Sequence, residues 1–223
     1  MTLEDLFLLE LNTVLNVENF ILKKDGGGYF AVRKYELGEQ IIFFETGKKW
    51  DGYFSVDIKV QLTNEPVQKI HSIVNNRNAP NAPISLRLSF LSKKMNNRDA
   101  NFERKKFNGR FGKYISLETL EQYRINLEEC LKNLILPFFQ KFENQNSFDN
   151  YINSPVLSGD YDFETSPIWK DAITSVIVAK LIDSKDLKSL FKIWFNQDLQ
   201  KGVGFDTRME LTKLKEILNN IEE

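Results

Sequence analysis

The sequence predicts an α+β fold: an antiparallel sheet of about five strands, a β-meander plus one, with an N-terminal helix and a C-terminal helical region packed on one face. Three observations predict this class. β-rich runs lie before residue 92, whereas helical periodicity dominates after residue 116. Segment 53–62 alternates apolar and polar residues, which is typical of an antiparallel strand with one buried face.

The first half of the chain predicts one helix followed by the sheet. An amphipathic helix is expected over residues 3–15, with Thr2 as its N-cap and Asp5 in its first turn. A glycine cluster then separates two short β-rich runs, which predicts a hairpin, and Asp51-Gly52 predicts the turn before the fourth strand. The expected strands span 19–24, 29–35, 39–47, 53–62 and 84–91.

The remaining segments show helical patterns. Asn64 is expected to cap a short helix between the fourth and fifth strands, and Ser116 to cap a long helix that ends at Pro137. Asp206 is expected to cap the last helix. These helices are expected at 64–74, 117–136, 147–153, 166–182, 185–195 and 206–221.

The domain organisation predicted from these elements is simple. We expect a sheet domain over residues 1–115 and a helical region over residues 116–223 that is continuous with the same domain. No repeat of solenoid length and no low-complexity linker divides the 223 residues.

Composition narrows the class of protein. A hydrophobic content of 42% and a charged content of 27% are typical of a globular chain. The single cysteine, Cys130, allows no internal disulfide, which fits a reducing compartment. The N-terminus is acidic where a signal peptide needs a basic start, and the apolar runs are too short to span a bilayer. We therefore expect a cytoplasmic protein without membrane contact, and the abundance of Asn, Lys and Ile suggests a bacterial source.

A resemblance to a known family rests on two stretches. Trp50 at a turn precedes an F-x-V-x-I strand made by Phe54, Val56 and Ile58, and the later stretch LPFFQKFENQNSFDNYI combines a proline with aromatic residues where one helix ends and a short one begins. Over roughly residues 1–200 the chain is similar to a widespread bacterial family known only as a domain of unknown function. The family has no established activity or catalytic residues to carry over to this chain, and small proteins of this general type resemble partners of toxins or other effectors.

Few residues in the sequence could support a catalytic site. His71 is the only histidine, so any triad or metal site would depend on it, and a partly buried surface position is the expected role. Cys130 follows two glutamates, which raise rather than lower a thiol pKa, and it is expected to be a small buried hydrophobe. We expect no catalytic residues and no cofactor, although an enzyme of an unrecognised class stays an alternative.

An acidic loop is a weak candidate for cation binding. Asp160, Asp162 and Glu164 alternate and, in an extended segment, would point the same way. The sixth-position glycine of an EF-hand is missing, and Ser166-Pro167 reads as the start of a helix whose dipole favours nearby acids. We therefore expect no metal site.

A basic–aromatic segment stands out from the rest of the chain. Eight basic and two acidic residues give segment 92–113 a net charge of +6, against −1 for the whole protein. It is interpreted first as a solvated loop, second as a protein-docking element, and third as a nucleic-acid site in which phenylalanines stack on bases. The candidate partner-binding residues are Arg104, Lys105, Lys106, Phe107, Arg110, Phe111 and Lys113.

The functional hypothesis follows from these observations. The leading interpretation is a non-catalytic protein that binds another protein with an acidic surface, in the manner of an immunity protein or antitoxin. The alternative is a nucleic-acid-binding protein that uses segment 93–113, with affinity that falls steeply with salt.

Overall fold

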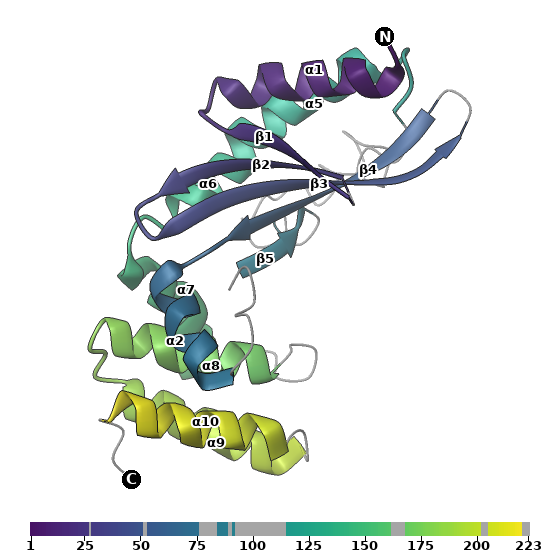
Figure 1. The fold of residues 1–223 in the computed structure, drawn as a ribbon. Coiled ribbons are helices and arrows are strands. Elements are labelled where there is room, and N and C mark those ends of the chain that lie inside the picture. Colours follow the sequence, from purple (N-terminus) through teal and green to yellow (C-terminus); the bar gives the residue numbers. More distant parts are fainter. Residues whose placement is uncertain are drawn as a thin grey trace. The chain divides into compact units, whose positions relative to one another are not determined.

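The computed structural model describes most of the chain (Figure 1). The described residues are 1–26, 28–50, 53–75, 84–88, 91, 115–161, 168–201 and 205–219. The chain forms two compact units, and each is built from two separate stretches of sequence. Unit 1 comprises Met1–Leu62 and Ile84–Lys141, and unit 2 comprises Thr63–Pro83 and Phe142–Glu223. Because compact units need not fold independently, the predicted domain boundary at residue 115 stays a prediction.

Unit 1 contains a five-stranded antiparallel sheet in which each strand pairs with the next in sequence. This arrangement confirms the predicted α+β class and the β-meander. The strands are β1 (Ile21–Asp25), β2 (Gly28–Tyr35), β3 (Gly38–Trp50), β4 (Tyr53–Leu62) and β5 (Ile84–Arg87).

The pairing of β2 with β3 depends on Gly28. A Cβ atom at this position would lie 2.1 Å from the backbone oxygen of Phe44 on β3, so only glycine lets the two strands approach. The predicted Asp51-Gly52 turn lies outside the described residues, but β3 and β4 pair up to Trp50 and Tyr53 on either side of it.

The fifth strand is shorter than predicted. The sequence predicts a strand over 84–91, but β5 ends at Arg87. Leu88 and Leu91 are buried in helical turns instead, which shows that alternating hydrophobicity over this segment reflects burial rather than strand pairing. Phe90, also predicted to point inward, lies outside the described residues.

One face of the sheet packs against α1 (Leu3–Asn16) and α5 (Leu120–Cys130), which lie side by side (Figure 1). Thr2 and Asp5 form the capping box that starts α1, as predicted. Phe7 is 0% exposed and contacts three other rings, one each on β2, β4 and α5. These rings belong to Tyr29, Phe54 and Tyr123.

The long helix after the sheet starts and ends later than predicted. The helix begins at Leu120 with Thr119 in the N-cap position, so Ser116 is not the cap. The Thr119 hydroxyl oxygen instead accepts a hydrogen bond from the Ser116 backbone N–H. The helix then continues through a π-helical turn, Leu131–Ile135, into α6 (Leu136–Gln140), with Pro137 inside it. The backbone N–H of Leu136 bonds the carbonyl of Leu131 five residues back. This wider turn directly precedes Pro137, where a regular α-helix would lose a bond and clash with the proline ring.

Unit 2 is a helical bundle around α8 (Ile168–Leu181), which contacts the other four helices described in the unit. Residues 172–179 are each at most 3% exposed, so this part of α8 is buried on all sides and has no amphipathic pattern. The surrounding helices are α2 (Glu65–Asn75), α7 (Gln145–Ser158), α9 (Leu187–Lys201) and α10 (Phe205–Leu218).

The ends of these helices agree in part with the ends predicted from the sequence. Asn64 caps α2 as predicted, because its side-chain oxygen accepts a hydrogen bond from the Val67 backbone N–H. Asn144 caps α7, which is longer than the predicted 147–153 and ends at the left-handed Gly159. Asp206 is not the cap of α10, since that helix already begins at Phe205.

Candidate functional site

The predicted partner-binding residues all lie in segment 92–114, outside the described residues. The two ends of this segment are nevertheless placed in unit 1. Leu91 is 0% exposed, and Ile115 exchanges two backbone hydrogen bonds with Phe54 of β4, at 3.2 and 2.8 Å. The residues that flank the basic–aromatic segment are therefore fixed in unit 1, Leu91 in its core and Ile115 beside β4.

The residues considered for catalysis are buried. His71 is 1% exposed, so the expected partly buried surface position is wrong: the side of α2 that carries it packs into the bundle. Cys130 is 0% exposed and lies in the core of unit 1, as predicted for a small buried hydrophobe.

The acidic loop gives no metal centre in the part of the chain that is described. Asp160 is exposed, and its carboxylate accepts a hydrogen bond from the Ser158 hydroxyl at 2.8 Å. Asp162 and Glu164 lie outside the described residues. Among the described histidine, cysteine and acidic side chains, no group of three could hold a metal ion.

The second face of the sheet carries an apolar surface that we call the outer-face patch. Paired residues of neighbouring strands point to the same face, and the register aligns two rows across β1, β2 and β3. The residues of the outer-face patch are Ile21, Phe30, Val32, Ile41 and Phe43.

The accessibility of these side chains distinguishes the two faces of the sheet. On the inner face, Ala31, Ile42 and Val60 are each 0% exposed beneath the helices. On the outer face, Phe30, Ile41 and Phe43 are half-buried and Ile21 is 66% exposed, while Val32 is 7% exposed. The outer-face patch is thus a partly accessible apolar surface held on rigid strands.

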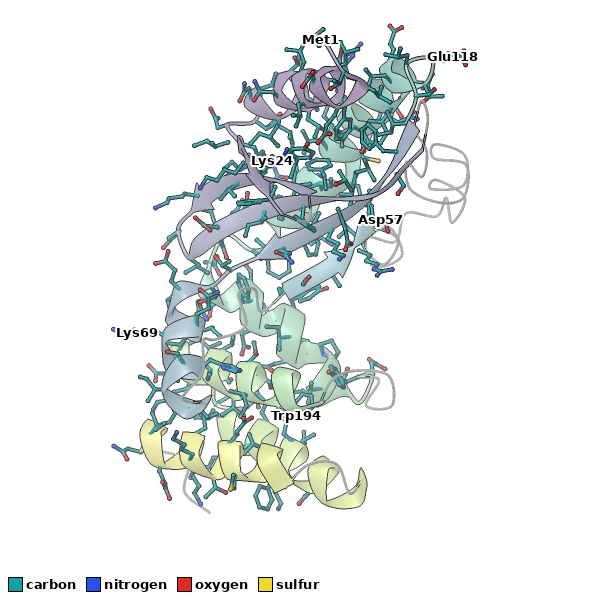
Figure 2. The ribbon with its side chains drawn as sticks, turned by 45° about the vertical axis from the view of Figure 1, so that its right-hand side comes forward. Met1, Lys24, Asp57, Lys69, Glu118 and Trp194 are labelled. Atoms are coloured by element: carbon teal, nitrogen blue, oxygen red, sulfur yellow. The ribbon has the colours of Figure 1, made fainter. Side chains whose placement is uncertain are left out.

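Charged side chains border the outer-face patch on β4. The Lys59 ammonium lies 2.6 Å from the Glu45 carboxylate and 5.8 Å from the centre of the Phe43 ring. Both contacts hold the aliphatic part of the Lys59 side chain against apolar surface and leave its ammonium group at the rim of the outer-face patch. Asp57 on the same face is exposed (Figure 2), which agrees with the predicted alternation in β4.

The sequence of β3 contains a signal for the outer-face patch. The alternation of apolar and polar residues in β4 made this signal easy to overlook. Residues 41–44 read Ile-Ile-Phe-Phe, and an unbroken apolar run is typical of a strand covered on both faces. An antiparallel meander with one solvated face needs no such run. The apolar outward positions of β3 therefore indicate a surface suited to contact with another structure.

Unit 2 contains a buried polar cluster of a different kind. The Ser175 hydroxyl donates to the Asn153 side-chain oxygen and accepts from the Trp194 indole N–H at 2.7 Å. The Asn153 amide nitrogen donates to Asp149 at 2.7 Å and to the Ser175 carbonyl at 3.1 Å. Because these groups satisfy one another inside the bundle, the cluster positions α7, α8 and α9 and offers no free nucleophile.

Asp149→Asn is expected to raise the free energy of unfolding near neutral pH. Burial raises the pKa of the Asp149 carboxyl above its ordinary value of 3.8, and nearby Asp186 raises it further, against the lowering effect of the Asn153 hydrogen bond. A carboxyl with a raised folded-state pKa contributes stability at low pH, and this stability is lost as pH rises through that pKa.

Urea denaturation of wild type and Asp149→Asn, from below pH 3.8 to pH 7, tests this expectation. The difference in unfolding free energy should grow with pH in favour of the variant. The exposed Asp57→Asn is the control, and a difference that does not change with pH would contradict the role given to Asp149.

Comparison with known proteins adds no relative. No family model, curated protein sequence or solved structure matches this chain. The resemblance to a family of unknown function therefore stays a prediction. Within the described residues, no helix has the length and apolar character needed to cross a membrane.

Proposed function

We propose that this protein acts without catalysis, by binding another protein through unit 1. The outer-face patch carries the proposal, because β2 and β3 present half-buried Phe30, Ile41 and Phe43 together on a face opposite the helices. Aromatic side chains at the centre of an apolar surface, with charges at its rim, are the usual anchors of protein interfaces.

The energetics favour the binding of a partner at such a surface. Burying accessible apolar area contributes about 25 cal/mol per Å², and side chains held on paired strands lose little conformational freedom on binding. The Lys59 contact with Phe43 adds a cation beside the aromatic ring. A partner that covers this lysine and the rings together gains from both interactions.

The basic–aromatic segment contributes the second element of the proposal. The segment carries a net charge of +6. The residues that flank it, Leu91 and Ile115, belong to unit 1. A cationic segment of this kind accelerates encounter with an acidic protein surface and disfavours basic partners. The proposed partner therefore has an acidic surface, and an immunity- or antitoxin-like complex in the cytoplasm is the particular form that we propose.

Replacing both Ile41 and Phe43 by serine is expected to reduce partner capture by about tenfold or more, equivalent to about 1.4 kcal/mol. Tagged wild type and variant are used to pull down proteins from a lysate of the source cells, and the recovered proteins are quantified by mass spectrometry. Neutralising Arg104, Lys105, Lys106, Arg110 and Lys113 should weaken capture further and remove its dependence on salt.

Met209→Ser is the matched control, since Met209 is a 54% exposed apolar residue on α10 in unit 2. It should capture the same proteins as wild type. Equal recovery by the Ile41/Phe43 variant and wild type would contradict the proposal. Recovery of nucleic acid that is lost at high salt, with no protein enriched, would favour the nucleic-acid alternative instead.

A further inference from the structure

β1 forms one edge of the sheet and pairs only with β2 among the described strands. An edge strand carries a row of backbone N–H and C=O groups that another extended segment can pair with. Its five residues are Ile-Leu-Lys-Lys-Asp, and two of them are exposed cations, Lys23 and Lys24. Lys24 is labelled in Figure 2.

The register identifies the backbone groups that face outward from β1. Asp25 pairs with Gly28 across a two-residue loop, and such a closing pair exchanges hydrogen bonds, as do alternate pairs beyond it. Ile21 and Lys23 therefore direct their backbone groups toward β2. Leu22 and Lys24 direct theirs away from the sheet.

An independent contact supports this assignment. The same alternation, followed through β2 and β3 to β4, directs the backbone groups of Phe54 away from β3. Phe54 indeed exchanges both of its backbone hydrogen bonds with Ile115 on that side. The pattern that leaves Leu22 and Lys24 facing outward is thus consistent across the sheet.

The side chains around this edge suit an extended acidic segment. Ile21 is 66% exposed and continues the outer-face row formed with Val32 and Ile41, so an added strand would extend the outer-face patch. Lys23 is exposed on the outer face. On the inner face the Lys24 ammonium lies 3.8 Å from the Glu4 carboxylate of α1, and the Lys24 side chain is still 72% exposed. Acidic side chains at alternate positions of an added strand all point to one face, where they would meet Lys24, while the residues between them would point to the outer face and extend the outer-face patch.

Charge argues against two other occupants. Antiparallel pairing of two copies of β1 centred on Lys23 would place that lysine against its counterpart, and like charges directly opposite are unfavourable. The chain's own segment 92–113 carries a charge of +6 and would be repelled as well. An acidic strand from a different protein meets neither obstacle.

We propose that β1 accepts an extended, acidic segment of the partner protein as an additional strand next to Leu22 and Lys24. This inference rests on the proposed function and names the way in which the partner binds. Backbone hydrogen bonds supply affinity in strand addition, and the alternate side chains supply specificity.

The test uses a fluorescent peptide of alternating valine and glutamate, and a second peptide with lysine in place of glutamate. Wild-type protein should bind the glutamate peptide about tenfold more tightly than the lysine peptide. Hydrogen exchange should show the peptide protecting the Leu22 and Lys24 amides. Absence of protection at these amides, or equal binding of both peptides, would overturn the proposal.

Lys24→Pro removes the outward N–H at a position where an edge strand tolerates proline. It should reduce the affinity for the glutamate peptide about tenfold. Lys24→Gln keeps the N–H, loses the charge and should weaken it only a few-fold. Equal binding by Lys24→Pro and Lys24→Gln would contradict strand addition. Should Lys24→Pro fail to fold, the amide protection in wild type decides the question.

The same variant separates this inference from the proposed function. In the lysate experiment, Lys24→Pro should lose the captured partner together with the Ile41/Phe43 variant. Normal capture by Lys24→Pro, with capture lost only in the Ile41/Phe43 variant, would overturn strand addition and leave the proposed function intact. Self-association of the wild type through protected Leu22 and Lys24 amides would assign the edge to a second copy and overturn the acidic partner.

Discussion

Replacing Phe7 by alanine is expected to lower the free energy of unfolding by about 3–5 kcal/mol, the range found for truncation of fully buried aromatic residues. The ring is 0% exposed and lies 5.1 Å from Phe54, 5.6 Å from Tyr123 and 6.4 Å from Tyr29, measured between centroids. Its removal leaves a cavity where α1, α5 and the sheet meet. Urea denaturation followed by far-UV circular dichroism measures the change.

Leu9→Ala on the same helix is the matched control. Leu9 is 55% exposed, so its truncation removes little buried area and should change stability by less than about 0.5 kcal/mol. A loss at Leu9 as large as that at Phe7 would show that α1 is stabilised through a different face from the one described.

Asn153→Ala is expected to lower the free energy of unfolding by about 2–4 kcal/mol, because it removes the hydrogen bonds of Asn153 to Asp149, to the Ser175 hydroxyl and to the Ser175 carbonyl, and a buried polar group that loses its partner costs about 1–3 kcal/mol. Asn153 is 0% exposed and joins Asp149, Ser175 and, through the serine hydroxyl, Trp194. The Trp194 indole lies in unit 2 (Figure 2), so tryptophan fluorescence during urea denaturation, measured in a Trp50→Phe background, reports unfolding there.

Asn150→Ala separates this effect from the loss of an asparagine in a helix. Asn150 lies one helical turn earlier on α7 and is exposed, so its replacement should be nearly neutral. Similar stability losses at the two positions would show that the hydrogen-bonded cluster does not hold the bundle together.

Local patterns predicted most of the sheet and the starts of several helices. The alternation of apolar and polar residues in β4 correctly predicted that Phe54, Val56 and Ile58 are buried. A strand that is buried on one face has apolar residues at every second position, and this pattern is visible in the sequence. Thr2 and Asn64 were recognisable as caps, since their side chains bond backbone groups within the same turn.

Features that depend on distant partners were harder to predict. Pro137 indicated a helix end, but the preceding π-helical turn accommodates it, and nothing local in Leu131–Ile135 signals that turn. His71 lies on a short helix whose buried side is decided by the bundle around α8. The outer-face patch required the register of β1, β2 and β3, although residues 41–44 gave a partial signal.

The construction of unit 1 from two stretches of chain has a consequence for synthesis on the ribosome. The strands up to Leu62 emerge well before α5, which begins at Leu120 and supplies part of the cover for their inner face. At translation rates of about 5–20 residues per second, several seconds separate the two events. During that interval the nascent sheet depends on α1 for cover, and its apolar inner face is a surface that chaperones recognise.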